Sequence, residues 1–118
     1  MFEKIDLNSV APGSVWMTAS GYPAIISEVN SSKMHGLVVS PGGPVTASWD
    51  GEGKNQSNLR EFYDLKYAPG IISDTHVILK KGMLIGTARE FEDAKRTGEL
   101  NGADLVSKLS DLKVEMFR

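Results

Sequence analysis

The chain has 118 residues, with 13 basic and 15 acidic side chains, no cysteine and a formal net charge of −2. This length suits one domain that buries a proper core, and the lack of cysteine excludes disulfides and thiol chemistry. No apolar run approaches the roughly 18 residues that span a bilayer, and the first residues lack the pattern of a signal peptide. We therefore expect a cytoplasmic protein with no membrane partner.

The charges are spread evenly along the chain. Residues 1–70 carry 5 basic and 7 acidic side chains, and residues 71–118 carry 8 of each. A protein that neutralises many phosphates needs a basic face. Nucleic acid is therefore not the favoured partner, although the sequence leaves open a local basic patch formed in three dimensions.

The first half of the chain predicts a series of short strands. Residues 1–12 form an N-terminal arm, and Pro12-Gly13 is a turn signal. The segments that follow are rich in β-branched and aromatic residues and are separated by Gly, Pro, Asn and Ser. Gly36 indicates a bulge or sharp bend. The predicted strands are Val15–Thr18, Ala24–Val29, Met34–Ser40 and Val45–Trp49.

Three further strands are expected in the middle of the chain. Arg60–Tyr67 alternates between polar and apolar side chains and predicts a closing strand. Thr75–Lys80 and Met83–Ala88 predict a hairpin around the turn Lys80-Lys81-Gly82.

The last thirty residues have a different character. Arg89–Arg96 favours a helix that Thr97-Gly98 would end. Ala103–Leu112 predicts a second helix, because its leucines repeat at helical spacing. Lys113–Arg118 is expected to be a short strand or a frayed end.

Together these elements predict a mainly β protein, residues 1–118 forming a single domain. It would consist of an arm (1–12), a β-meander or barrel (13–67), a hairpin (71–88) and a helical tail (89–118). We expect a small antiparallel SH3-like barrel or curled sheet with one or two short C-terminal helices. Trp16 and Trp49 are the expected anchors of its core.

Residues 13–66 also resemble small SH3-like β-barrel proteins of phages and bacteria, most of which have no assigned activity. The resemblance implies an accessory protein of a phage or mobile element that works by binding. It implies no particular site residue. The residues that carry it are Gly13, Trp16, Gly21, Ile25 to Val29, Gly36 to Val38, Trp49, Gly51, Asp64 and Leu65.

Two glycine-rich stretches could contact a ligand. Gly51-Glu52-Gly53-Lys54-Asn55 looks like a phosphate loop, but its first position is Ser48 and Asn55 stands where a magnesium-binding hydroxyl is needed. We interpret it as an exposed turn. Pro41-Gly42-Gly43-Pro44 could line a cleft, and we interpret it as a turn held on both sides by proline.

No set of residues predicts catalysis, a metal site or a cofactor. His35 and His76 are the only histidines, and no spacing preorganises carboxylates around them. We expect both to be structural, with His76 a satisfied residue at a strand end. The charged set from Glu90 to Arg96 is interpreted as the solvated face of a helix. The protein is predicted not to be an enzyme.

A candidate interaction surface remains. Aromatic side chains favour protein interfaces and also stack on single-stranded bases. Tyr22 and Tyr63 are the aromatic residues best placed for a surface role. The full candidate set is Tyr22, Lys54, Arg60, Tyr63, Lys80 and Lys81.

These observations predict a non-enzymatic interaction protein, in the leading version one that binds and modulates a host protein. Three alternatives stay open at this point: a nucleic-acid-binding barrel, a protein that sequesters a small molecule or nucleotide, and a structural component of a phage particle. A homodimer formed through a short edge strand is also possible.

Overall fold

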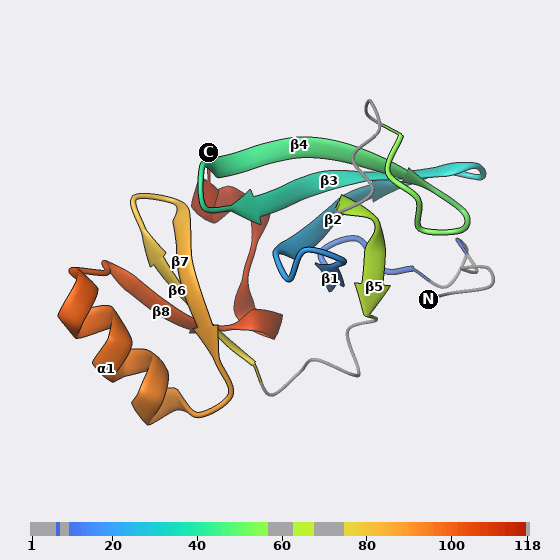
Figure 1. The fold of residues 1–118 in the computed structure, drawn as a ribbon. Helices are drawn as coiled ribbons and strands as arrows, with labels where there is room; N and C mark the ends of the chain where they lie inside the picture. Colours follow the sequence, from blue (N-terminus) through green and yellow to red (C-terminus); the bar gives the residue numbers. More distant parts are fainter. Residues whose placement is uncertain (1–6, 8–9, 57–62, 68–74, 118) are drawn as a thin grey trace.

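The computed structural model describes residues 7, 10–56, 63–67 and 75–117. Two antiparallel sheets form the molecule (Figure 1). The five-stranded sheet has the order β4-β3-β2-β1-β5, and the three-stranded sheet has the order β7-β6-β8. The strands of the first sheet are β1 (Val15–Thr18), β2 (Pro23–Val29), β3 (Lys33–Ser40), β4 (Gly43–Asp50) and β5 (Leu65–Tyr67). The other elements are β6 (His76–Lys80), β7 (Met83–Ala88), α1 (Phe91–Asn101), β8 (Leu105–Lys108) and the 3₁₀-helices η4 (Leu109–Asp111) and η5 (Val114–Phe117).

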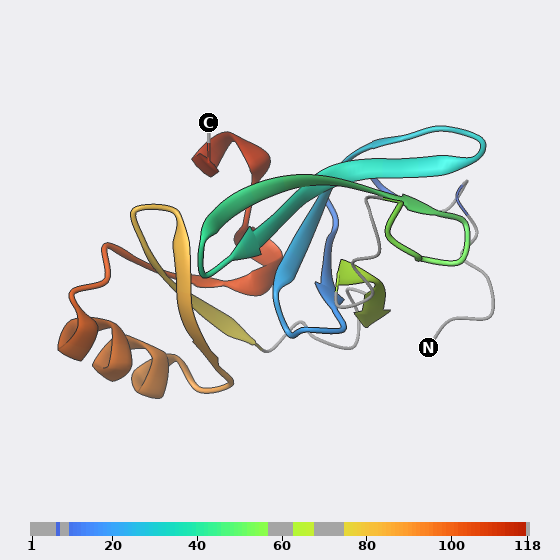
Figure 2. The same ribbon diagram turned by 45° about the horizontal axis from the view of Figure 1, so that its top comes forward.

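The prediction of a mainly β protein with a curled antiparallel sheet is confirmed. Figure 2 shows the long strands β3 and β4 bending across the sheet. The turns between the strands follow from local chemistry. Between β3 and β4, Ser40 pairs with Gly43 across Pro41-Gly42, and Gly43 adopts a φ of 113° that favours glycine. The four strands predicted in residues 15–49 are confirmed to within two residues at each end.

The irregularity predicted at Gly36 is present as a bulge in the neighbouring strand β2, opposite Gly36. Ile26 pairs with Gly36 and Glu28 with His35, so Ser27 is the extra residue of a bulge in β2. The Ser27 hydroxyl donates a hydrogen bond to the His35 carbonyl at 3.1 Å. Position 36 needs glycine because a Cβ there would overlap the main-chain carbonyl of Ile25.

Strand β1 and the first part of β2, residues 23–26, are buried on both faces, and this explains the apolar runs Val15–Met17 and Pro23–Ile26. One face of the five-stranded sheet carries the first core, which contains Trp16, Ala24, Ile26, Met34, Val38, Ala47, Trp49 and Leu65. The other face packs against the three-stranded sheet and forms the second core. That core contains Val15, Met17, Ile25, Val39, Val77, Leu79, Leu84, Leu109 and Leu112.

The two tryptophans anchor the first core, as expected. Trp49 is fully buried and Trp16 is 7% exposed. Each indole N–H has a hydrogen-bond acceptor, because Trp49 donates to the Tyr63 carbonyl at 2.7 Å and Trp16 to the Ser14 hydroxyl at 3.0 Å. From the N-terminal arm, Leu7 and Val10 pack against the same core.

The predicted closing strand over residues 60–67 is shorter than expected. Strand β5 covers Leu65–Tyr67 and pairs with β1. Leu65 is buried and Lys66 is exposed, in agreement with the predicted alternation. Residues 60–62 lie outside the described residues.

The prediction that Thr97-Gly98 ends the helix was wrong. Helix α1 continues to Asn101 and ends at Gly102, which has a φ of 71°. Gly98 lies inside the helix, where a Cβ would come within 3.1 Å of the Val106 side chain, so its small size lets α1 approach β8. No helix in the described part of the chain is long and apolar enough to cross a membrane.

The second predicted helix, over Ala103–Leu112, was also wrong. Leu105–Lys108 forms β8, which pairs with β6, and Leu109–Asp111 forms η4. The leucines reach the second core from these two elements. Beyond them, Val114–Phe117 forms η5 in place of the expected strand or frayed end.

Candidate functional site

The two candidate tyrosines are half-buried. Tyr22 lies in the turn before β2 and packs against both cores. Tyr63 lies just before β5 and packs against the first core. Arg60 lies outside the described residues.

The candidate lysines Lys80 and Lys81 have local structural contacts. The Lys81 main-chain N–H donates to the Asp104 carboxylate at 2.9 Å and ties the β6–β7 turn to the loop before β8. The Lys80 amine lies beside Gly102, at the C-terminal end of α1. A Cβ added to Gly102 would be 3.6 Å from the amine nitrogen. A cation at this end interacts favourably with the helix dipole.

The structure does not gather the candidate residues at one site. Lys54 lies in the loop after β4 and forms an exposed ion pair with Glu52 at 3.6 Å. Figures 1 and 2 place this green loop and the β6–β7 turn, which holds Lys81, at opposite ends of the molecule. A basic surface built from all these lysines is therefore not present.

The glycine-rich loop after β4 is organised by the carboxylate of Asp50. The Asp50 carboxylate accepts hydrogen bonds from the main-chain N–H groups of Glu52 at 2.8 Å and Lys54 at 3.1 Å. The Asn55 N–H donates to the Asp64 carboxylate at 2.7 Å. These are the donors that a phosphate loop would direct to its ligand, so the expected turn is confirmed.

The histidines have structural surroundings. The Nδ1 atom of His76 lies 3.0 Å from the Arg89 carbonyl, and its ring meets Phe91 edge-on with centroids 5.6 Å apart. His35 is half-buried in β3. Within the described ranges, no three His, Cys, Asp or Glu residues lie close enough together to hold a metal ion.

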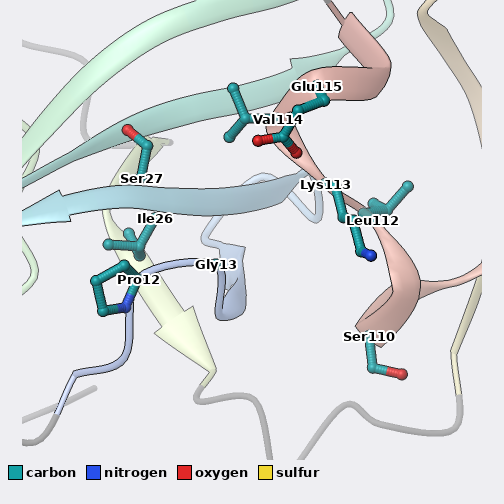
Figure 3. A pocket seen from close by; sticks show the side chains of 9 residues that line it. All are labelled: Pro12, Gly13, Ile26, Ser27, Ser110, Leu112, Lys113, Val114 and Glu115. Carbon is teal, nitrogen blue, oxygen red and sulfur yellow. The ribbon is translucent and has the colours of Figure 1, made fainter.

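A groove of about 490 Å³ opens between the start of β1, the bulge of β2 and the C-terminal segment (Figure 3). It was not predicted from the sequence. The residues that line it are Pro12, Gly13, Ile26, Ser27, Ser110, Leu112, Lys113, Val114 and Glu115.

Both walls of the groove are held by the fold. On one side, the Gly13 N–H donates to the Ile26 carbonyl, and the Ile26 N–H donates to the Ser14 carbonyl at 2.9 Å, which extends the pairing of β1 with β2. On the other side, Leu109 and Leu112 are almost fully buried in the second core. The groove is therefore largely preformed.

The C-terminal wall carries one charge of each sign. Lys113 and Glu115 are exposed, and Figure 3 shows their side chains pointing in different directions. The ion pairs among the described residues join Lys54 to Glu52 and Arg96 to Asp93. The charges of Lys113 and Glu115 are thus available to a ligand.

No family model, curated protein or solved structure matches the chain.

Proposed function

We propose that the protein is a non-enzymatic interaction protein that binds a segment of another protein in the groove between β2 and the C-terminal segment. The observation that carries this proposal is the largely preformed groove of about 490 Å³, which has a mixed apolar and polar lining and carries the charges of Lys113 and Glu115. Binding sites are typically concave and apolar, with a few polar groups that fix the orientation of the ligand.

The two charges fit a peptide better than a purely apolar ligand. Pro12 and Val114 supply apolar contact area, whereas Lys113 and Glu115 lie two residues apart with opposite sign. Complementary charges on a partner would fix its register and direction in the groove. The accessory role for a phage or mobile element, acting on a host protein, rests on the sequence resemblance and stays a prediction.

Affinity capture of the tagged protein from bacterial lysate tests the proposal. We expect one stoichiometric protein partner that survives nuclease treatment and is lost with Lys113→Glu. The exchanged variant Lys113→Glu with Glu115→Lys keeps the net charge and is the matched control. It is expected to stay folded and to lose the partner as well, because the charge pattern is reversed.

Two results contradict the proposal. Loss of the partner on nuclease treatment would assign the interaction to nucleic acid. Capture that is equal for the wild type and both charge variants would exclude the groove as the binding site.

A further inference from the structure

Helix α1 ends on the pair Asn101-Gly102, and both residues are exposed. Gly102 is the left-handed residue that closes the helix, with a φ of 71°. Its main-chain nitrogen lies 3.5 Å from the Glu99 carbonyl oxygen, which is at the upper limit of a hydrogen bond. The main-chain nitrogen that follows Asn101 is therefore held only weakly.

The main-chain nitrogen of the next residue is the natural nucleophile for an asparagine side chain. The nitrogen forms a bond to the asparagine Cγ and loses its proton, the bond from Cγ to Nδ2 breaks, and ammonia leaves. The product is a five-membered succinimide. A glycine in the next position favours this attack, because it has no Cβ to hinder the approach and its main chain rotates freely.

Water then opens the succinimide in one of two ways. Addition of water at Cγ breaks the new bond and gives aspartate. Addition at the main-chain carbonyl carbon breaks the original peptide bond and leaves the chain connected through Cγ, which gives isoaspartate. The isoaspartyl main chain is one carbon longer. Neither step oxidises or reduces the chain, and both products carry a negative charge.

We propose that Asn101 is a site of spontaneous deamidation, with Gly102 as the source of the attacking nitrogen. In the closed helix, the Asn101 Nδ2 donates to the Thr97 carbonyl at 2.7 Å and holds the carboxamide back along α1. The attack therefore begins when the last turn of the helix opens. Helix ends open at little cost in free energy, and both residues of the pair already face solvent.

The other asparagines in the described part of the chain are held more firmly. The Asn30 carboxamide oxygen accepts hydrogen bonds from the N–H groups of Ser32 and Lys33, both at 2.9 Å. Asn55 is half-buried, and its Nδ2 donates to a carbonyl of β4 at 3.3 Å. In the whole sequence, Asn101 is also the only asparagine followed by glycine. We therefore expect Asn101 to react first.

Isoaspartate at this position would disturb the contact between α1 and the three-stranded sheet. The Ala103 N–H donates to the Gly98 carbonyl at 2.8 Å across the helix end, and the Asp104 N–H donates to the Leu79 carbonyl at 3.0 Å. Figure 1 shows the end of α1 leading into β8. An extra main-chain carbon at position 101 changes the spacing between these groups. Isoaspartate therefore loosens the end of the helix, whereas aspartate leaves the main chain unaltered.

Peptide mapping of the aged, full-length protein tests the proposal. Trypsin cuts after Arg96 and Lys108, and the peptide 97–108 holds Asn101 as its only asparagine. After incubation of the folded protein at mildly alkaline pH, this peptide should gain about one mass unit and separate into aspartyl and isoaspartyl forms. We expect conversion at Asn101 to be at least about tenfold faster than at Asn30. Asn101→Gln lengthens the side chain and should leave the peptide unmodified.

Amide hydrogen exchange measured by NMR tests the effect on the helix end. The isoaspartyl form in the aged sample should give a second set of signals, in which Ala103 exchanges about tenfold faster than in fresh protein. Asn101→Asp is the matched control, because it carries the same charge on an unaltered main chain. Its exchange at Ala103 should stay within about twofold of the wild type.

Each part of the inference has a result that would overturn it. Conversion at Asn101 that is no faster than at Asn30, or that occurs only in denaturant, would show that the closed helix end protects the side chain. Exchange at Ala103 that is equal in the isoaspartyl form and in Asn101→Asp would exclude a loosened helix end.

Discussion

The indole N–H of Trp49 donates a 2.7 Å hydrogen bond to the main-chain carbonyl of Tyr63 and joins β4 to the segment before β5. The Leu65 N–H donates to the Gly53 carbonyl at 2.8 Å and strengthens the same connection. The Trp49 side chain is fully buried, and Tyr63 is half-buried. The hydrogen bond between them fixes how the chain closes over the first core.

Replacement of Trp49 by phenylalanine is expected to lower the free energy of unfolding by about 3 kcal/mol, because it leaves a cavity and removes the hydrogen bond that joins β4 to the segment before β5. Trp16→Phe is the matched comparison. Its indole donates to the Ser14 hydroxyl, only two residues away, so this hydrogen bond does not join distant segments and we expect a loss below about 2 kcal/mol. Urea unfolding followed by far-UV circular dichroism measures the free energy of unfolding of both variants. Equal losses of this free energy would contradict the role given to the Tyr63 contact.

Gly36→Ala is expected to destabilise the protein by at least about 3 kcal/mol, because the new methyl group would overlap the Ile25 carbonyl and push β2 from β3. Gly42→Ala is the control. The nearest atom to a Cβ at that position is the Ser40 hydroxyl at 3.8 Å, so the expected change is within about 0.5 kcal/mol. Thermal unfolding compares the two variants, and similar melting temperatures would refute the steric explanation.

Removal of the Asp50 carboxylate should loosen the loop that follows β4. Asp50→Ala deletes the acceptor of the Glu52 and Lys54 N–H groups, and we expect a loss of about 2 kcal/mol. Asp50→Asn keeps one acceptor oxygen and should cost about half as much. Chemical denaturation gives the free energy of unfolding of each variant. Amide hydrogen exchange at Lys54 should accelerate in the alanine variant. Unchanged exchange there would show that the carboxylate does not order the loop.

Gly102→Ala tests where helix α1 ends. At a φ of 71° a side chain is strained, so alanine is expected to cost about 1 kcal/mol. Asparagine tolerates this conformation better and should cost less. Equilibrium unfolding distinguishes the two substitutions. An alanine variant as stable as the wild type would mean that the helix does not depend on a left-handed residue at its end.

The strands of the first sheet could be predicted because their turns are encoded locally. Asn30 illustrates this, since its side chain accepts hydrogen bonds from the N–H groups of Ser32 and Lys33, both at 2.9 Å. Such contacts depend on neighbouring residues alone. The alternation of Ala47 and Trp49 toward the core likewise needs no knowledge of the rest of the chain.

The C-terminal region was misread because packing overrides local preference there. Leu105 and Leu109 are four residues apart, a spacing that suits one face of a helix and also one face of a strand. Gly98 resembles a helix end in sequence, yet its missing side chain serves the contact with Val106. The groove was missed for a related reason, because its walls come from Gly13, Ser27 and Lys113, which are far apart in the sequence.

The burial of β1 on both faces has a consequence for how the protein unfolds. Trp16 and Val15 are adjacent residues, yet they belong to different cores. Loss of the three-stranded sheet would expose one side of β1 to water and would weaken the strand that also carries the first core. We therefore expect heat or denaturant to unfold both cores in one cooperative transition.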